Sequence, residues 1–230
     1  MSLLARLKKL FRRPPSVSRV GARRPTHFPL PADASQEDAL RSRLHDDPNN
    51  VEAFSALAEL VRRRATEVAR PDPLTADTGP IDLTSTANTA HWALAEELAG
   101  SPRAWFPLIE LARLSLEEDR EGAMRRLGAA CGRNPDGHAL VEGIKMLREA
   151  HLPGEALGLG VGHWSPRDQI SEAGRQVVRA ALDAGRAGEA RHHLSALAEY
   201  GAGRSGTADV VAELEPFVAA AEDAAREQRG

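Results

Sequence analysis

Alanine recurs along this chain at a nearly constant interval, and this interval constrains the fold more than any other feature of the sequence. Ala90, Ala123, Ala156 and Ala190 follow one another at steps of about 33 to 34 residues. In three of the four cases Leu follows four residues later. A small residue allows two helices to cross closely, and a large one a turn later fills the space towards the next pair. The interval therefore predicts a row of similar helix pairs.

Helical periodicity extends over most of the chain. Apolar residues recur at the spacing of one helix face in ten segments after residue 33, and the alternating β-branched runs that indicate strands are sparse. Because only 4% of the residues are aromatic, the core must consist mainly of Leu, Ala and Val, which suits closely packed helices. We predict an all-α fold with helices at residues 34–46, 50–69, 86–99, 103–117, 120–132, 137–150, 153–164, 167–184, 187–199 and 207–228.

This spacing resembles that of the tetratricopeptide repeat, whose second helix reads Ala-x3-Phe, ends in Pro and recurs every 34 residues or so. Pro follows the first two alanines by twelve residues, at positions 102 and 135. The family's first helix reads Trp-x2-Leu-Gly-x2-Tyr. Alternative residues match this pattern in Phe54-x2-Leu57-Ala58-x2-Val61, and Leu108-x2-Leu111-Ala112 matches it in part. The resemblance covers residues 34–200. It implies an α-solenoid of stacked antiparallel helix hairpins that works by binding, with a capping helix at 207–228.

The repeat pattern is interrupted in two ways. Gly143 and Gly174 stand where the family has a large residue, and Gly160 replaces its aromatic residue, so another α-solenoid or a helical bundle is the alternative fold. In addition, the step from Gln36 to Ala90 exceeds one repeat by about 20 residues. We interpret the excess as a loop inserted at about residues 70–89, because insertions in solenoids map to loops on one face. Residues 33–230 then form one helical-repeat domain.

The first 32 residues differ from the rest of the chain in charge. They carry eight basic residues and no acidic one, whereas the remainder has 22 basic residues against 33 acidic ones. This split indicates a basic arm on an acidic body. Residues 2–13 have the periodicity of a short amphipathic helix, and the Pro- and Gly-rich residues 14–32 are typical of a flexible linker.

The predicted helix at residues 2–13 combines an apolar face with basic side chains. Such a segment binds reversibly to an anionic membrane surface, because apolar burial and attraction to the lipid headgroups add together. We therefore hypothesise a membrane-binding arm, and the alternative is that this helix packs against the helical-repeat domain as an additional core element. Its apolar residues are Leu3, Leu4, Leu7, Leu10 and Phe11, and its basic residues include Lys8, Lys9, Arg12 and Arg13.

The sequence also indicates a compartment. No segment has the ~20 apolar residues that a membrane-spanning helix needs, and the N-terminus lacks the pattern of a secretory signal. Cys131 is the only cysteine, so no disulfide forms within the chain, which fits a reducing compartment. Lys occurs at three positions and all other basic residues are Arg, a bias typical of GC-rich genomes. We expect a bacterial cytoplasmic protein that is peripheral to the inner membrane through its arm.

Two patterns that resemble ligand sites have simpler structural interpretations. The glycines at 158, 160 and 162 lack the preceding strand of a phosphate loop, so we interpret them as small residues at a close helix crossing. His192 and His193 are adjacent on a predicted helix and point about 100° apart, which does not suit a shared metal ion.

Two further patterns are also interpreted as structural. Cys131 follows Ala129 and Ala130 at a helix end and is interpreted as a small core residue. The acidic run at residues 117–119 favours the N-terminus of the next helix electrostatically. We find no catalytic motif and predict no metal or cofactor, so we expect the chain not to be an enzyme.

The resemblance also implies a binding groove, because the first helices of tetratricopeptide stacks line the concave face. Equivalent positions along these helices, and their neighbours, carry mostly basic side chains: Glu59, Arg113, Lys145 and Arg179, with Arg62, Arg148 and Arg175 nearby. Basic residues there suit an acidic peptide or a C-terminal carboxylate. The family's carboxylate-binding members also use Asn, which is missing here, so that specific function is not expected. Ordinary solvated surface charge is the alternative interpretation.

Together these observations predict a non-enzymatic scaffold or adaptor that binds a protein or peptide partner, with an anionic membrane surface as a second partner for residues 2–13. The alternative is a nucleic-acid- or ribosome-associated factor whose basic arm contacts phosphates.

Overall fold

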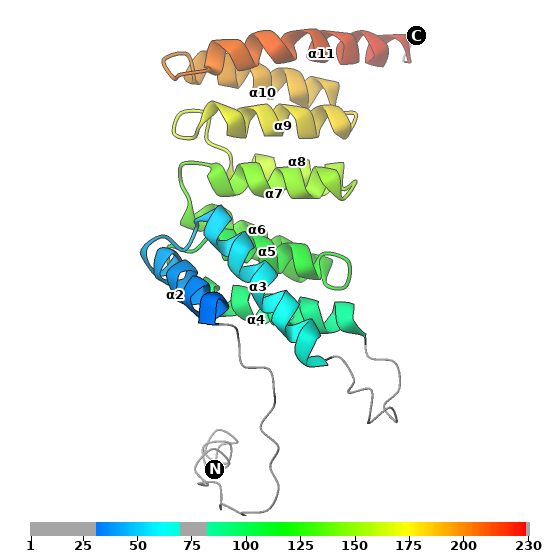
Figure 1. Ribbon diagram of the computed structural model, residues 1–230. Helices are drawn as coiled ribbons and strands as arrows, with labels where there is room; N and C mark the ends of the chain where they lie inside the picture. The colour runs from blue at the N-terminus through cyan, green and yellow to red at the C-terminus, as the bar shows by residue number, and fades with distance from the viewer. Residues whose placement is uncertain (1–30, 70–81, 229–230) are drawn as a thin grey trace, which may run out of the picture. The chain divides into compact units, whose positions relative to one another are not determined.

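The described part of the protein is entirely helical. In the computed structural model, residues 31–69 and 82–228 are described, and their regular structure consists of α-helices without a strand (Figure 1). The all-α prediction is therefore confirmed. The helices are α2 (Pro31–Asp46), α3 (Val51–Ala69), α4 (Leu83–Ala99), α5 (Phe106–Ser115), α6 (Arg120–Arg133), α7 (His138–Glu149), α8 (Pro153–His163), α9 (Ser171–Asp183), α10 (Ala187–Tyr200) and α11 (Thr207–Glu227).

The ten helices predicted after residue 33 correspond in order to α2–α11, and the largest differences lie at four N-termini. Helix α2 begins at Pro31 instead of 34. Helix α9 begins at Ser171 instead of 167, because the side chain of Gln169 donates to the carbonyl of His163 and holds a turn there. Helix α5 begins at Phe106 instead of 103. Helix α4 begins earlier than predicted, at Leu83, because the carboxylate of Asp82 accepts hydrogen bonds from the backbone N–H groups of residues 84 and 85.

Two predicted features fall largely outside the described residues. The basic arm and most of its linker, residues 1–30, are not described, although Pro31 and Ala32, which we assigned to the linker, belong to α2. Of the predicted insertion at about residues 70–89, positions 70–81 are not described, and residues 83–89 are helical.

The helices pack in chain order. Each one contacts the next from α2 to α11, and additional contacts join α5 to α7, α7 to α9, α9 to α11 and α6 to α8. Helices α7 and α9 consequently lie side by side, with α8 and α10 behind them in the view of Figure 1. Helices α5, α6, α7 and α9 therefore meet both their partner in the hairpin and the corresponding helix of the next hairpin.

Successive turns are tied together along one edge of the stack. The backbone N–H of Ile170, just before α9, donates over 3.0 Å to the carbonyl of Asp136, just before α7. The side chain of Asn49 accepts from the backbone N–H groups of Trp105 and Phe106 at 2.7 and 3.0 Å. In this second link, Asn49 is 56 and 57 positions away from its two partners in the sequence, because the segment between α3 and α4 intervenes. The contact explains why α5 starts at Phe106.

Two arginines strengthen the same edge. Nη1 of Arg133, at the end of α6, donates to three carbonyls of the α4–α5 turn, those of residues 99, 101 and 104, at 2.9, 3.1 and 2.8 Å. Arg204, in the α10–α11 turn, donates to the carbonyls of residues 166, 167 and 169 in the α8–α9 turn. A guanidinium has five N–H donors in a fixed geometry, so one side chain satisfies several turn carbonyls that lack helical partners.

Three of the four periodic alanines lie at equivalent buried positions. Ala123, Ala156 and Ala190 have no exposed surface, and the backbone N–H of each donates to the carbonyl of the residue at its helix N-cap. The prediction was wrong for Ala90, which is only half-buried. In α4 the buried residues are Ala87, His91, Leu94 and Ala95, the same spacing as Ala123, Leu127, Ala130 and Cys131 in α6. The residue of α4 that corresponds to Ala123 is therefore Ala87, about one turn before the predicted position.

Glycines in the first helices make room for large side chains from the second helices. A Cβ at Gly143 would lie 2.9 Å from a methyl of Leu159, and one at Gly174 would lie 2.8 Å from a methyl of Leu197. Close crossing also explains Gly160, where a Cβ would lie 3.0 Å from Val177. It does not explain Gly158 and Gly162, where a Cβ would meet nothing within 4 Å. The interpretation of these two glycines as crossing residues was wrong, because the face of α8 that carries them is not packed.

The alanine positions yield a prediction about stability. Ala123→Leu adds bulk at a helix crossing with no space for it, so we expect the free energy of unfolding to fall by about 1–3 kcal/mol. Ala90→Leu, at the half-buried position of α4, should cost less than about 1 kcal/mol. Urea denaturation of both variants measures the difference, and equal losses would contradict the assignment of Ala123 as a crossing residue.

Candidate interaction surface

The basic residues predicted for a groove lie on helices that pack against one another. Arg113 is in α5, Lys145 and Arg148 are in α7, and Arg175 and Arg179 are in α9. Since α5 contacts α7 and α7 contacts α9, the fold gathers side chains that are far apart in the sequence.

Acidic side chains from following helices pair with these cations. Nε of Arg148 lies 2.5 Å from a carboxylate oxygen of Asp183. On the next first helix, Nη2 of Arg175 is 3.1 Å and Nη2 of Arg179 is 2.5 Å from the carboxylate oxygens of Glu213 in α11. The face is therefore a ladder of ion pairs between successive helices, and we call it the charge-ladder face, made of α5, α7, α9 and α11.

Exposure divides the five cations into two groups. The side chains of Arg148 and Arg175 are 24% and 28% exposed and bridge neighbouring helices. Arg113, Lys145 and Arg179 are 44%, 41% and 39% exposed. Lys145 pairs within its own helix, with Glu142 at 3.3 Å. Arg113 likewise pairs within its own helix, with Glu110 at 3.3 Å, and lies 3.9 Å from Glu149 of α7. The more exposed group is the one whose charges can reach a partner.

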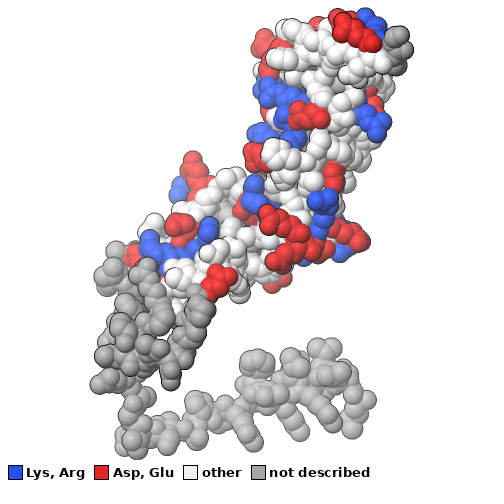
Figure 2. Space-filling model, turned by 90° about the vertical axis from the view of Figure 1, so that its right-hand side faces the viewer, with Lys and Arg blue, Asp and Glu red and all other residues white. Residues whose placement is uncertain are grey.

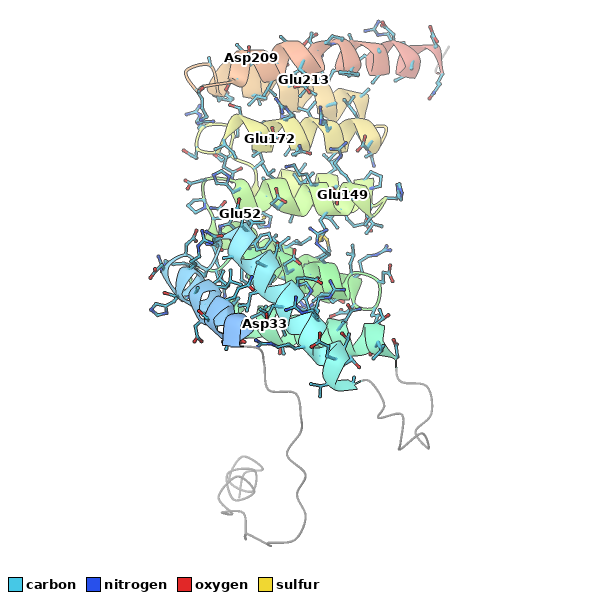
Figure 3. The ribbon with its side chains drawn as sticks, in the orientation of Figure 1. Asp33, Glu52, Glu149, Glu172, Asp209 and Glu213 are labelled. Carbon is cyan, nitrogen blue, oxygen red and sulfur yellow. The ribbon has the colours of Figure 1, made fainter. Side chains whose placement is uncertain are left out.

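The acidic half of this face was missed by reasoning from the sequence, although the repeat spacing carries a signal for it. Arg148 and Asp183 are 35 residues apart, and Arg179 and Glu213 are 34 residues apart. An arginine followed by an acid at about this spacing is thus the pattern that predicts a bridge. Figure 3 shows further carboxylates on this side of the molecule, from Asp33 and Glu52 to Glu172 and Asp209.

A buried polar cluster lies beside the first rung of the ladder. Nε2 of His91 in α4 is 3.5 Å from a carboxylate oxygen of Glu110 in α5, and the ring centroid of Phe54 is 5.8 Å from that of His91. Burial lowers the pKa of His91, and the positive charges of Arg62 and Arg113 lower it further, although Glu110 acts in the opposite direction. His91 is therefore held neutral, and its role is structural packing between α3, α4 and α5.

In α10, His193 is partly buried, and His192 beside it is exposed. The rings of His192 and His193 have centroids 5.4 Å apart, and His193 contacts the Trp164 ring edge-to-face at 5.5 Å. Burial and the neighbouring His192 lower the pKa of His193. Within residues 31–69 and 82–228, no group of three or more potential ligands from His, Cys, Asp and Glu is placed to hold a metal ion.

The structural interpretation of Cys131 is confirmed, and that of the acidic run at residues 117–119 is confirmed for one of its residues. Cys131 is buried in the hydrophobic core, which confirms it as a core residue, and this burial raises the pKa of its thiol to about 12. Of the acidic run, Asp119 caps α6, since its carboxylate accepts from the backbone N–H of Gly122 at 2.8 Å. Glu117 and Glu118 make no such contact and lie at the surface of the described helices.

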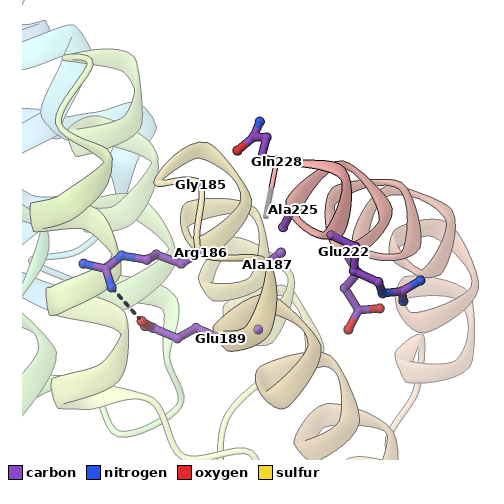
Figure 4. A pocket seen from close by; sticks show the side chains of 9 residues that line it. Gly185, Arg186, Ala187, Glu189, Glu222, Ala225 and Gln228 are labelled. Carbon is purple, nitrogen blue, oxygen red and sulfur yellow. Dashed lines mark ion pairs between the residues drawn. The ribbon is translucent and has the colours of Figure 1, made fainter. Parts of the chain in front are cut away.

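A hollow of about 710 Å³ lies between the α9–α10 turn and the end of α11 (Figure 4). Its charged side chains are paired: Arg186 with Glu189 at 3.6 Å, and Glu222 with Arg191 at 2.9 Å. These pairs satisfy one another instead of converging on the centre of the hollow, so it gives no indication of a ligand.

Comparison with known proteins identifies no relative. No protein-family model, curated protein or solved structure matches this sequence. Among the described helices, none has both the length and the apolar character needed to cross a membrane. The membrane-binding residues predicted in the arm, from Leu3 to Arg13, lie outside the described part of the chain.

The two histidines with lowered pKa values yield a prediction about pH. At pH values between the ordinary pKa of about 6.5 and the lower pKa values of His91 and His193 in the folded chain, these two side chains take up protons only in the unfolded chain. Stability should therefore fall as the pH is lowered from about 7.5 to about 6. His91→Gln with His193→Gln should flatten this dependence, as measured by urea denaturation. His138→Gln, at an exposed position, is the control, and an unchanged slope in the double variant would refute the assignment.

Proposed function

We propose that this chain is a non-enzymatic scaffold that binds a protein partner, built as a tetratricopeptide-like α-solenoid with α11 as its capping helix. The recurrence of contacts between turns supports this architecture. Ile170 reaches Asp136 at 3.0 Å, and Ser171 reaches Thr207 at 2.7 Å. A stack of similar hairpins presents a continuous surface made from helices that are distant in sequence, and proteins of this kind use such surfaces for binding.

The observation that carries the proposal is the charge-ladder face. Its helices α5, α7, α9 and α11 pack in a row, and the first three expose Arg113, Lys145 and Arg179 in succession. The ion pairs of these residues are at least partly exposed, and such pairs are worth only about 0–1 kcal/mol each. An acidic segment of a partner can therefore exchange with the intramolecular carboxylates at little cost. Charge-assisted hydrogen bonds from several cations would then fix its position.

Charge reversal tests this proposal. Arg113→Glu, Lys145→Glu and Arg179→Glu combined should abolish capture of the partner recovered with the full chain, because each change places like charges against an acidic segment. A matched triple variant, Arg43→Glu, Arg125→Glu and Arg186→Glu, alters exposed cations in α2, α6 and the α9–α10 turn and should retain capture. Circular dichroism checks the helical content of both. Undiminished capture by the first variant would refute the charge-ladder face as the binding surface.

We further propose that the protein is bacterial and cytoplasmic, and that residues 2–13 attach it reversibly to the inner membrane. The support is the combination of five apolar residues with a charge of +8 over residues 1–32. Apolar burial alone is weak for so short a segment, and each basic residue near an anionic surface adds up to about 1 kcal/mol. The alternative, a nucleic-acid- or ribosome-associated factor, rests on the same positive charge but does not require the apolar residues.

The apolar residues of the arm separate these two possibilities. Leu7→Glu with Phe11→Glu should eliminate sedimentation of the full chain with vesicles that contain anionic phospholipid, while vesicles of neutral phospholipid bind neither protein. Thermal unfolding of the two proteins checks that the helical body is equally stable in both. If the double variant still binds RNA with the affinity of the original chain, and that affinity falls steeply with salt, the nucleic-acid function is supported in place of the membrane one.

A further inference from the structure

A groove lies at the edge opposite the tied turns. Two hollows of about 640 and 440 Å³ adjoin there, and both are lined by Asn88, Leu114 and Glu118. The first half of α4 forms one wall, and the α5–α6 and α7–α8 turns form the other. We call this feature the edge groove. Of the cations of the charge-ladder face, Arg113 lines the smaller hollow, whereas Lys145 and Arg179 line neither.

Apolar side chains line the interior of the edge groove. Leu114 and Leu152 are half-buried, and Leu116 is 9% exposed. At the other end stands Trp92, whose ring is covered by the guanidinium of Arg126 at 5.0 Å. Each apolar residue retains surface that faces the hollows, so side chains of leucine or phenylalanine size have complementary surface to bury there.

Acidic side chains outnumber basic ones around the groove, whose charged lining residues are Asp82, Glu117, Glu118 and Asp119 against Arg113, Arg120 and Arg126. Arg126 pairs with Asp119 at 3.7 Å, and Arg120 pairs with Glu155 at 3.2 Å. Glu117 and Glu118 form no ion pair within the described part of the chain. Figure 2, which faces this edge, shows acidic side chains gathered beside the middle of the stack. Because the arginines on the rim are already paired, a ligand meets an acidic surface.

We propose that the edge groove binds a basic amphipathic segment of a partner protein. The apolar face of such a segment enters the two hollows over Leu114 and Leu152. Its Lys or Arg side chains pair with Glu117 and Glu118. This is recognition of an amphipathic helix in a groove, in which apolar anchors provide affinity and the charged rim selects the sign of the partner and its orientation. The site adjoins the charge-ladder face at Arg113 and has the opposite charge preference.

A synthetic amphipathic peptide tests the proposal directly. The probe is a fluorescent 14-residue peptide of Leu and Lys at helical spacing, and the control peptide has Glu in place of every Lys. Fluorescence anisotropy with the full chain should show binding of the Lys peptide and none of the Glu peptide. Raising the salt concentration from about 50 to about 300 mM should weaken binding severalfold, because ionic screening reduces the attraction at the rim.

Matched variants locate the binding site. Glu117→Lys with Glu118→Lys should weaken binding of the Lys peptide at least about tenfold, and Leu114→Gln should weaken it as well. Glu96→Lys with Glu199→Lys makes the same change of net charge at two exposed acids outside the groove, and it should alter the affinity less than about twofold. Equal losses in the two double variants would show diffuse attraction to an acidic body and overturn the proposal, as would unchanged binding by the first.

The same assay separates this inference from the proposed function. Lys145→Glu with Arg179→Glu disables the charge-ladder face but leaves the groove, so it should not weaken peptide binding. If that variant binds the peptide normally and fails to capture its partner, the chain has two surfaces. If the variant of Glu117 and Glu118 binds the peptide normally, the edge groove is refuted while the scaffold function stands.

Discussion

The close crossing of helices at small residues is the constraint on which the rest of this structure depends. Ala123, Ala156 and Ala190 have no exposed surface, and each lies on the first turn of the second helix in its hairpin. Gly143 and Gly174 on the first helices leave space for Leu159 and Leu197. Close packing fixes the distance between hairpins, because the buried side chains leave no space into which a neighbouring helix could shift. The spacing of turns, bridges and surface charges follows from that distance.

The two edges of the stack are built differently, and this gives them different capacities to bind a ligand. Along one edge, Asn49, Arg133 and Arg204 satisfy the carbonyl and N–H groups of neighbouring turns. Backbone groups that are already paired offer little to a ligand. Along the other edge, the α5–α6 turn carries Glu117 and Glu118 without such ties, next to apolar side chains that line two hollows. Unpaired charge and unburied apolar surface are what a partner can use.

In the charge-ladder face, ion pairs on neighbouring helices follow one another and form one long charged surface. Bridges such as Arg148 to Asp183 hold adjacent hairpins in alignment. Arg113 and Lys145 are more exposed, and each pairs at 3.3 Å with an acid of its own helix. Partly exposed pairs contribute little to stability, so they are the pairs most readily exchanged for contacts with another protein. Arg179 combines both features, because it is 39% exposed and bridges α9 to Glu213 of α11 at 2.5 Å.

The sequence by itself determined the helices, their order and the period of their packing, because helical periodicity and the signals that begin and end helices are local. Breakers such as Pro48 and Pro135 placed most boundaries within a few residues, and the alanine interval located three of the four crossings. Only the tertiary structure decided that Ala87, not Ala90, is buried in α4, and that Gly158 and Gly162 face open space. It also decided that acids from following helices meet the arginines of the charge-ladder face. Each of these depends on the rotation of one helix against another. A rotation by a fraction of a turn changes which side chains meet, while the periodicity along each helix stays the same.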